Sequence, residues 1–152
     1  MSSGNVQIEL ERSAGMSIRK VSQDVLYSEF TDGAGTSGTL ALRDKIPAGS
    51  FVIGSKVNVK TGFTGDTTAV MDIGDGSDAD KFSYTTHNVY TAADNLLEHA
   101  DAGAGGTEIG LALVTSEATV TLTVTGGADF TSISAGRLVV DIFYLSTNVK
   151  LD

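Results

Sequence analysis

The residues with the strongest potential for chemistry are four aspartates in the stretch DIGDGSDAD. They are Asp72, Asp75, Asp78 and Asp80. Their carboxylates are the hard oxygen ligands that calcium prefers. The spacing fits neither the EF-hand loop nor the Gly-Gly-x-Gly-x-Asp calcium repeat, and aspartate and glycine are also the usual residues of turns between strands. We therefore favour a solvated hairpin loop between strands in VMDIG and DKFSY, with a calcium site at these aspartates as the alternative.

The other polar residues give little support for an enzyme. The two histidines, His87 and His99, lack the partners of a catalytic triad, because Glu98 and His99 are adjacent and point apart on a strand or a helix. No GxSxG or HExxH motif occurs, and the glycine-rich stretches lack the lysine of a phosphate-binding loop. A glycosidase needs only two carboxylates, but the chain has no tryptophan for sugar stacking. We expect two structural histidines, no catalytic residue and no cofactor.

Composition narrows the function classes further. The chain has 152 residues and a net charge of −9, which argues against binding to nucleic acid or to an anionic membrane surface. Without cysteine there is no disulfide framework or thiolate site. We see neither a signal peptide nor an apolar run of the roughly 20 residues that span a bilayer, so we expect synthesis in the cytoplasm.

Alternation with a period of two dominates the sequence. In ATVTLTVT, Val120, Leu122 and Val124 alternate with threonines, so one face of a strand is apolar and the other carries hydroxyl groups. Shorter alternations occur in VQIEL, SKVNVKT and EIGLALV, at residues 6–10, 55–61 and 108–114. In EIGLALV the alternation predicts one apolar face, made of Ile109, Leu111 and Leu113.

The turns between these runs complete the prediction of the fold. Glycine- and aspartate-rich turns separate about nine short runs, which is typical of an all-β antiparallel sandwich or barrel. Residues 91–100, TAADNLLEHA, contain good helix formers and predict either one short helix or a structured crossover loop. We expect an N-terminal arm or edge strand at residues 1–15, followed by a single domain at residues 16–152.

The strand predicted near the C-terminus, GRLVVDIFYLS, is apolar on nearly both faces. One face carries Leu138, Val140, Ile142 and Tyr144. The other carries Val139, Asp141, Phe143 and Leu145. A strand of this kind is covered twice, once by the opposing sheet and once by something else. The second cover is either a loop or the N-terminal arm of the same chain, or a neighbouring subunit.

Three segments together resemble small head proteins of tailed bacteriophages, known as decoration, cement or head-fibre-like proteins. The segments are DKIPAGSFVIGSKVNVKTGFTG, TAVMDIGDGSDADKFS and GGADFTSISAGRLVVDIFYL. The resemblance spans roughly residues 40–145 and does not include residues 1–35. It implies a β-sandwich or jelly-roll-like domain, assembly as a trimer and a position where capsid subunits meet.

These observations lead to one principal hypothesis, a decoration or cement protein on the phage capsid surface that binds the major capsid protein and stabilises the assembled head. We predict self-association as a homotrimer through Val139, Phe143 and Leu145. We predict the partner contact in the N-terminal arm, at Val6, Ile8 and Leu10. The alternatives are a calcium-dependent carbohydrate-binding or adhesin-type β-sandwich, and a phage tail or fibre component.

Overall fold

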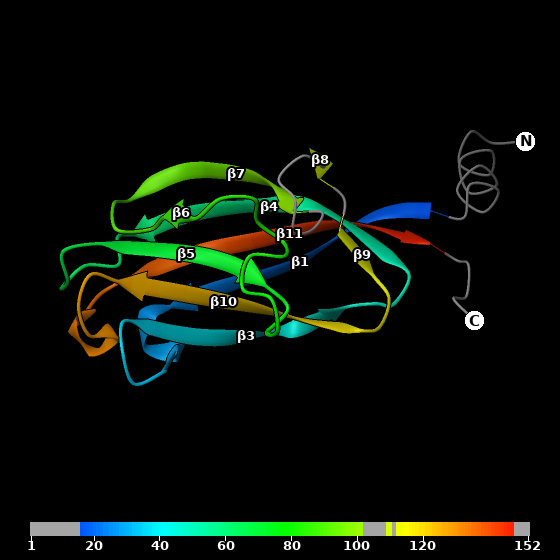
Figure 1. Cartoon of the computed structure of the whole chain (residues 1–152). Helices are drawn as coiled ribbons and strands as arrows, with labels where there is room; N and C mark the ends of the chain where they lie inside the picture. Colours follow the sequence, from blue (N-terminus) through cyan, green and yellow to red (C-terminus); the bar gives the residue numbers. More distant parts are fainter. Residues whose placement is uncertain (1–15, 102–108, 111, 148–152) are drawn as a thin grey trace, which may run out of the picture.

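The computed structural model describes residues 16–101, 109–110 and 112–147. Within these residues the chain forms eleven strands in two antiparallel sheets, which face each other as the two layers of a sandwich (Figure 1). The sandwich predicted from the alternating runs is therefore confirmed. Two short 3-10 helices, η1 (Tyr27–Glu29) and η2 (Phe130–Ser132), connect strands.

The first sheet has the strand order β1-β11-β4-β7-β8, and β9 also pairs with β4. Its strands are β1 (Met16–Leu26), β4 (Ser50–Thr61), β7 (Ala93–Asp101), β8 (Ile109–Gly110), β9 (Ala112–Val114) and β11 (Arg137–Thr147). The second sheet has the order β2-β3-β10-β5-β6. Its strands are β2 (Thr31–Asp32), β3 (Ser37–Ile46), β5 (Ala69–Gly74), β6 (His87–Asn88) and β10 (Ala118–Gly126).

The strand order is that of a jelly roll. Strands from the N-terminal part of the described chain pair with strands from its C-terminal part, β1 with β11 and β3 with β10. The next strands along the chain pair with the other sides of these C-terminal strands, β4 with β11 and β5 with β10. This wrapping distributes consecutive strands over two sheets, as in the double-sheet jelly rolls built from Greek keys. It also makes β11 an interior strand of the first sheet, paired with β1 on one side and with β4 on the other.

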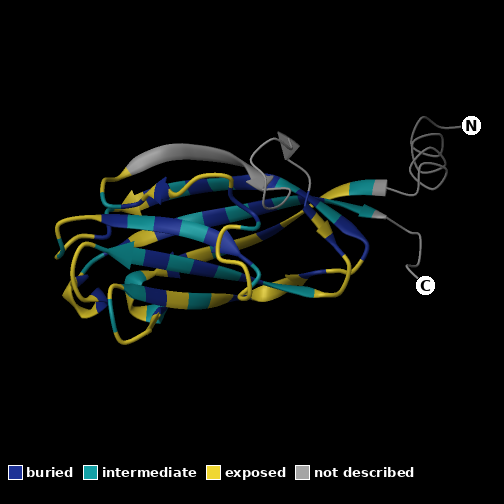
Figure 2. Ribbon diagram, in the orientation of Figure 1, coloured by how far each residue is buried: buried dark blue, intermediate teal, exposed yellow. Residues whose placement is uncertain are grey.

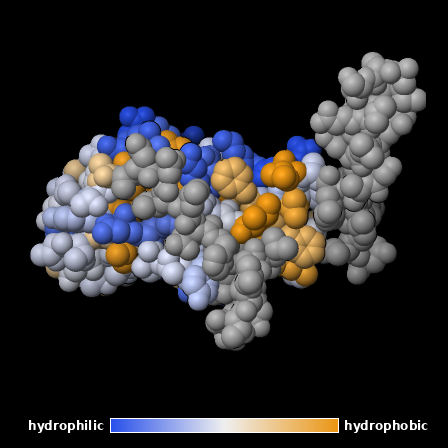
Figure 3. All heavy atoms as spheres, turned by 90° about the horizontal axis from the view of Figure 1, so that it is seen from above, coloured by the Kyte–Doolittle hydropathy of each residue, from blue (hydrophilic) through white to orange (hydrophobic). Residues whose placement is uncertain are grey.

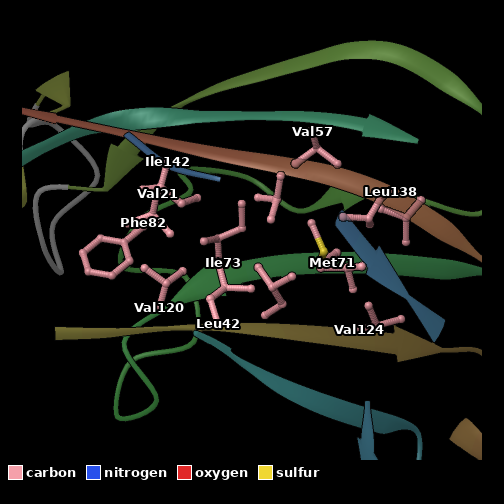
Figure 4. Close-up of a cluster of buried hydrophobic side chains, with 14 of the residues drawn as sticks. Val21, Leu42, Val57, Met71, Ile73, Phe82, Val120, Val124, Leu138 and Ile142 are labelled. Atoms are coloured by element: carbon pink, nitrogen blue, oxygen red, sulfur yellow. The ribbon is translucent and has the colours of Figure 1, made fainter. Parts of the chain in front are cut away.

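The hydrophobic core fills the space between the two sheets (Figure 4). Met71 and Ile73 of β5 and Leu122 of β10 are fully buried there, opposite Leu138 and Ile142 of β11. Buried and less buried residues alternate along these strands, as Figure 2 shows. The alternation follows directly from the period-2 geometry of a strand, which sends successive side chains to opposite faces.

The faces predicted for the two clearest strands are confirmed. In β10, Val120, Leu122 and Val124 are fully buried, and the threonines between them lie on the outer side. In β11, the inward residues are Leu138, Val140, Ile142 and Tyr144.

The short helix predicted within residues 91–100 is wrong. Ala93–Asp101 forms strand β7, which pairs with β4 and places Leu96 opposite Val57 and Leu97 opposite Lys56. A strand pair satisfies the backbone donors and acceptors on the exposed edge of β4, and this tertiary requirement outweighs the modest helix propensity of the segment.

Two strand predictions near the loops are also corrected. DKFSY forms no strand, because the chain folds back after β5 and the N–H of Phe82 donates to the carbonyl of Ile73 at 2.8 Å. In EIGLALV the described residues form β8 and β9 instead of one strand. In β9, Ala112 and Val114 are buried and Leu113 is 44% exposed, which reverses the predicted face. The register of β9 against β4 sets this orientation.

The predicted N-terminal arm at residues 1–15, with Val6, Ile8 and Leu10, lies outside the described residues. Met16 and Thr147 are paired, so β1 begins and β11 ends at the same end of the sandwich (Figure 1). No helix in the described ranges is long and apolar enough to cross a membrane.

We predict that Ile73→Ala lowers the free energy of unfolding by about 2–5 kcal/mol, because it leaves a cavity in the centre of the core. Urea unfolding followed by circular dichroism measures the change. Leu26→Ala is the matched control, since Leu26 is 46% exposed and its truncation should change the unfolding free energy by no more than about 0.5 kcal/mol. Equal losses in the two variants would contradict the assignment of the core.

Candidate interaction surface

The outer face of the first sheet carries the residues that sequence analysis predicted for self-association. Val139, Phe143 and Leu145 point away from the core and are half-buried. Asp141 stands between them on the same face. The structure therefore confirms the two-sided character of β11, while self-association itself stays a prediction.

Strand register extends this apolar face across four strands. Leu145 of β11 pairs with Ile18 of β1 on one side and with Phe51 of β4 on the other, and Phe51 pairs with Leu113 of β9. Paired residues share a face, so these side chains form one row across the sheet. Phe143 lies next to this row, two residues along β11. We call the five residues the outer patch: Ile18, Phe51, Leu113, Phe143 and Leu145.

The outer patch is open to solvent at both of its ends. Ile18 is 72% exposed and Leu113 is 44% exposed, which makes them two of the four large hydrophobic residues that are exposed in the described part of the chain. Figure 3 shows hydrophobic residues gathered toward the end of the molecule where β1 begins and β11 ends. Contiguous exposed apolar residues of this kind mark interaction surfaces.

Sequence reasoning missed Ile18 and Phe51. A signal for Ile18 exists, because it is out of phase with the buried Val21 and Val25 of the same strand. Phe51 precedes a β-bulge in β4, where the register against β11 shifts between Phe143 and Tyr144. The bulge changes which residues face outward, and a simple count along the sequence cannot place it.

Charged residues flank the outer patch along the same face. In successive rows, Lys20 pairs with Phe143, and Asp141 pairs with Lys56. Lys20 forms an ion pair with Asp141 at 3.4 Å. At the far end, Arg137 donates two hydrogen bonds to Asp24, at 3.1 and 2.7 Å. The hydrogen bond from Arg137 is the main cause that lowers the pKa of Asp24, and the charge of Lys60 contributes in the same direction.

This face differs in charge from the whole chain. Among the side chains described on the outer face of β1, β11 and β4 are four basic residues, Lys20, Lys56, Lys60 and Arg137, and two acidic residues, Asp24 and Asp141. The whole sequence has 10 basic and 19 acidic residues. The outer face of β1, β11 and β4 is thus a basic region on an acidic protein, which favours an acidic partner.

The aspartate-rich loop that follows β5 is organised by one of its own aspartates. The carboxylate of Asp75 accepts hydrogen bonds from the N–H groups of Ser77 and Asp78 at 3.0 and 2.9 Å, and from the ammonium of Lys81 at 2.6 Å. Partial burial opposes ionisation, but these donors outweigh it and lower the pKa of Asp75 to about 2. The carboxylate of Asp75 is therefore engaged in hydrogen bonds within the loop.

The other aspartates of the predicted calcium site are placed differently. Asp72 lies on β5 opposite Thr123, and burial together with the charge of Asp80 raises its pKa. Asp78 and Asp80 are exposed. Within the described ranges, no three His, Cys, Asp or Glu side chains gather in a group that could hold a metal ion. The loop geometry follows from internal hydrogen bonds, as in an Asx turn.

His87 links the two sheets. It lies on β6, is 3% exposed, and its Nε2 is 3.4 Å from the hydroxyl of Ser55 on β4. Sequence analysis expected His87 to be a structural histidine. The structure places it in the interior, between the layers.

The fold is similar to those of two chains from solved phage capsids. One belongs to the structure described as the cyanophage Pam1 capsid asymmetric unit, with 17% identity, a TM-score of 0.56, and 87% of this chain and 86% of that chain covered. The other belongs to the acid-stable capsid of the Helicobacter pylori bacteriophage KHP30, with 16% identity, a TM-score of 0.48, and coverage of 85% and 93%. No protein family and no curated protein sequence matches this chain.

We predict that Asp75→Asn lowers the free energy of unfolding at pH 7 by about 1–2 kcal/mol, since it removes the charge that the loop and Lys81 stabilise. The pKa of Asp75 lies below its ordinary value of 3.8, so the wild-type advantage is present above that pH. It should disappear as the pH falls from 3.8 toward 2. Urea titrations at a series of pH values test this.

Asp78→Asn is the matched control for this prediction, because Asp78 is an exposed carboxylate in the same loop and should change little. Both proteins are also measured with calcium and with chelator. If calcium stabilised the wild type and Asp75→Asn abolished this effect, the result would support the calcium site. It would contradict a loop held only by its internal hydrogen bonds.

Proposed function

We propose that this chain is a virion structural protein of a tailed bacteriophage, and that it decorates and stabilises the assembled head without catalysing a reaction. The observation that carries the proposal is the fold: the likeness to a chain of the cyanophage Pam1 capsid asymmetric unit covers 87% of this chain and 86% of the other. The resemblance of residues 40–145 to decoration and cement proteins points in the same direction.

The outer patch supports an assembled state. A protein that acts by binding to a capsid needs a compact scaffold and surfaces that are buried after assembly, and the outer face of the first sheet offers an apolar row with basic flanks. We propose that the protein forms a homotrimer through this face, including Val139, Phe143 and Leu145, at the surface of the capsid. Synthesis takes place in the host cytoplasm, and the partner is the major capsid protein.

The proposed mechanism is stabilisation by binding. A ligand that binds only the assembled head shifts the equilibrium toward assembly, and the gain grows with the ratio of its concentration to its dissociation constant. At a hundredfold ratio the gain is about 2.7 kcal/mol for each site. Many equivalent sites on one head add up, so modest affinity for each copy suffices.

The two alternatives differ in what the protein binds. Jelly rolls also occur in lectin domains, so the fold alone is compatible with a carbohydrate-binding module. The internal hydrogen bonds of Asp75 give that module no specific support. A tail or fibre component has the same needs as a head protein, and only the assembly to which the protein binds separates these two.

We predict that the purified protein binds saturably to heads assembled from the major capsid protein of the same phage. The bound heads should dissociate at a higher temperature than bare heads, because binding is linked to the assembled state. Co-sedimentation measures binding, and light scattering during a thermal ramp measures dissociation. Free capsid protein subunits are the control and should bind far less.

Other outcomes would contradict this proposal. Binding to isolated tails but not to heads would support the tail or fibre component. Failure to bind either assembly, together with glycan binding that requires calcium, would support the carbohydrate-binding module.

A further inference from the structure

We propose that the outer patch of each copy is the docking site for residues 6–10 of a neighbouring copy, so that exchanged N-terminal arms link the copies into a closed ring. This inference deepens the proposed function and rests on it only in requiring a symmetric oligomer. It assigns the arm to a second copy of this chain, whereas sequence alone suggested a contact with the capsid protein.

The outer patch has the form of a site for an extended segment. Ile18, Leu145, Phe51 and Leu113 make one continuous row across β1, β11, β4 and β9, and Phe143 stands beside the row. Ile18 is the most exposed large hydrophobic side chain among the described residues, at 72%. Burial of apolar surface contributes about 25 cal/mol of favourable free energy per Å². Covering this row therefore favours a partner that presents apolar side chains of its own.

The segment at residues 6–10 has this pattern. In VQIEL, the apolar residues Val6, Ile8 and Leu10 alternate with Gln7 and Glu9. An extended backbone sends alternate side chains to opposite sides. One side of the segment can therefore lie on the apolar row while the other side stays in water.

The charges of the two surfaces are complementary. Glu9 gives the segment one negative charge, Glu11 follows it directly, and no basic residue occurs before Arg12. Both glutamates lie on the side that stays in water, so they favour docking through the overall charge of the face and not through direct contacts with its lysines. The docking face presents Lys20 beside Phe143 and Lys56 in the next row. On a chain with net charge −9, these lysines reduce the repulsion that an acidic segment meets at this face.

The position of the arm suits a neighbouring copy. Residues 1–15 lead into β1 at Met16, two residues before Ile18, so the arm starts at the end of the sheet that bears the outer patch. To lie on its own patch, the chain would have to reverse direction within residues 11–15. An arm that continues in the direction of β1 instead leads away from its own patch, toward a copy packed at this end. Five residues span at most about 17 Å, so the patch that accepts residues 6–10 has to begin within about that distance of Met16.

Arm exchange can also join the copies into a closed ring in which every outer patch is covered. Each copy has one arm and one outer patch, and a contact between two different surfaces produces a ring when the rotation between copies closes. A ring of three copies is the trimer of the proposed function. In this ring, Phe143 and Leu145 take part in self-association as acceptors of the arm.

The first experiment measures the solution mass of the free protein by light scattering after size exclusion. We expect the wild type at three times the chain mass of 15.7 kDa, and both Ile8→Asp with Leu10→Asp and the single variant Ile18→Asp at one chain mass. Gln7→Asp is the matched control, because it adds a charge on the opposite side of the same segment and should keep the trimer. Far-ultraviolet circular dichroism checks that every variant is folded.

The second experiment separates exchange from folding back within one chain. The chain has no cysteine, so a variant with Ile8→Cys and Leu145→Cys contains only the intended pair. After mild oxidation, a denaturing gel without reductant should show covalently linked copies. An oxidised band at the mass of one chain would overturn the inference, because it would show the arm on its own patch. The absence of any cross-link would also overturn it.

Failure of this inference can be told from failure of the proposed function by testing the same variants on phage heads. If Ile8→Asp with Leu10→Asp keeps the mass of the wild type but loses binding to heads, the arm contacts the capsid and the inference is wrong while the proposed function holds. If the variant becomes a monomer and the wild type does not bind heads, arm exchange holds and the proposed function is wrong. A wild type that is monomeric overturns the inference directly.

Discussion

The pairing of β11 with β1 on one edge and with β4 on the other is the constraint on which the structure depends. This central strand buries Leu138, Val140 and Ile142 against the second sheet. Because side chains alternate, fixing these residues inward also fixes the residues between them outward. The same register that closes the core therefore creates the outer patch, and neither can be shifted without the other.

Sequence reasoning predicted the features that depend on the alternation of residues along one strand. It missed the features that depend on how strands pair with each other. The sandwich, the faces of β10 and both faces of β11 follow from alternation alone. The strand at Ala93–Asp101 does not, because its local propensity is helical and only the edge of β4 makes it a strand. Ile18 and Leu113 join the patch through strands distant in sequence, and a bulge turns Phe51 outward, so only the cross-strand register shows that these residues are neighbours.

The aspartate-rich loop shows how the same residue types can serve a structural purpose. In DIGDGSDAD, Asp75 holds the turn through backbone N–H groups and Lys81, and the loop returns Phe82 to the core. Sequence analysis favoured a loop over a calcium site because no known ligand spacing was present. Sequence analysis could not predict that Lys81, the residue directly after this stretch, would pair with Asp75, because this pairing depends on how the chain folds back.

The charge distribution favours a contact between unlike surfaces over a symmetric pairing of two outer patches. Two copies joined face to face would bring the basic residues of one against those of the other, since the described side chains on the outer face of β1, β11 and β4 include four basic residues and two acidic ones. Like charges at an interface are unfavourable, and desolvation increases the cost. A contact between the basic face and an acidic segment avoids this repulsion. Such unlike contacts generate a ring when the rotation between copies closes, and a trimer of this kind has that cyclic symmetry.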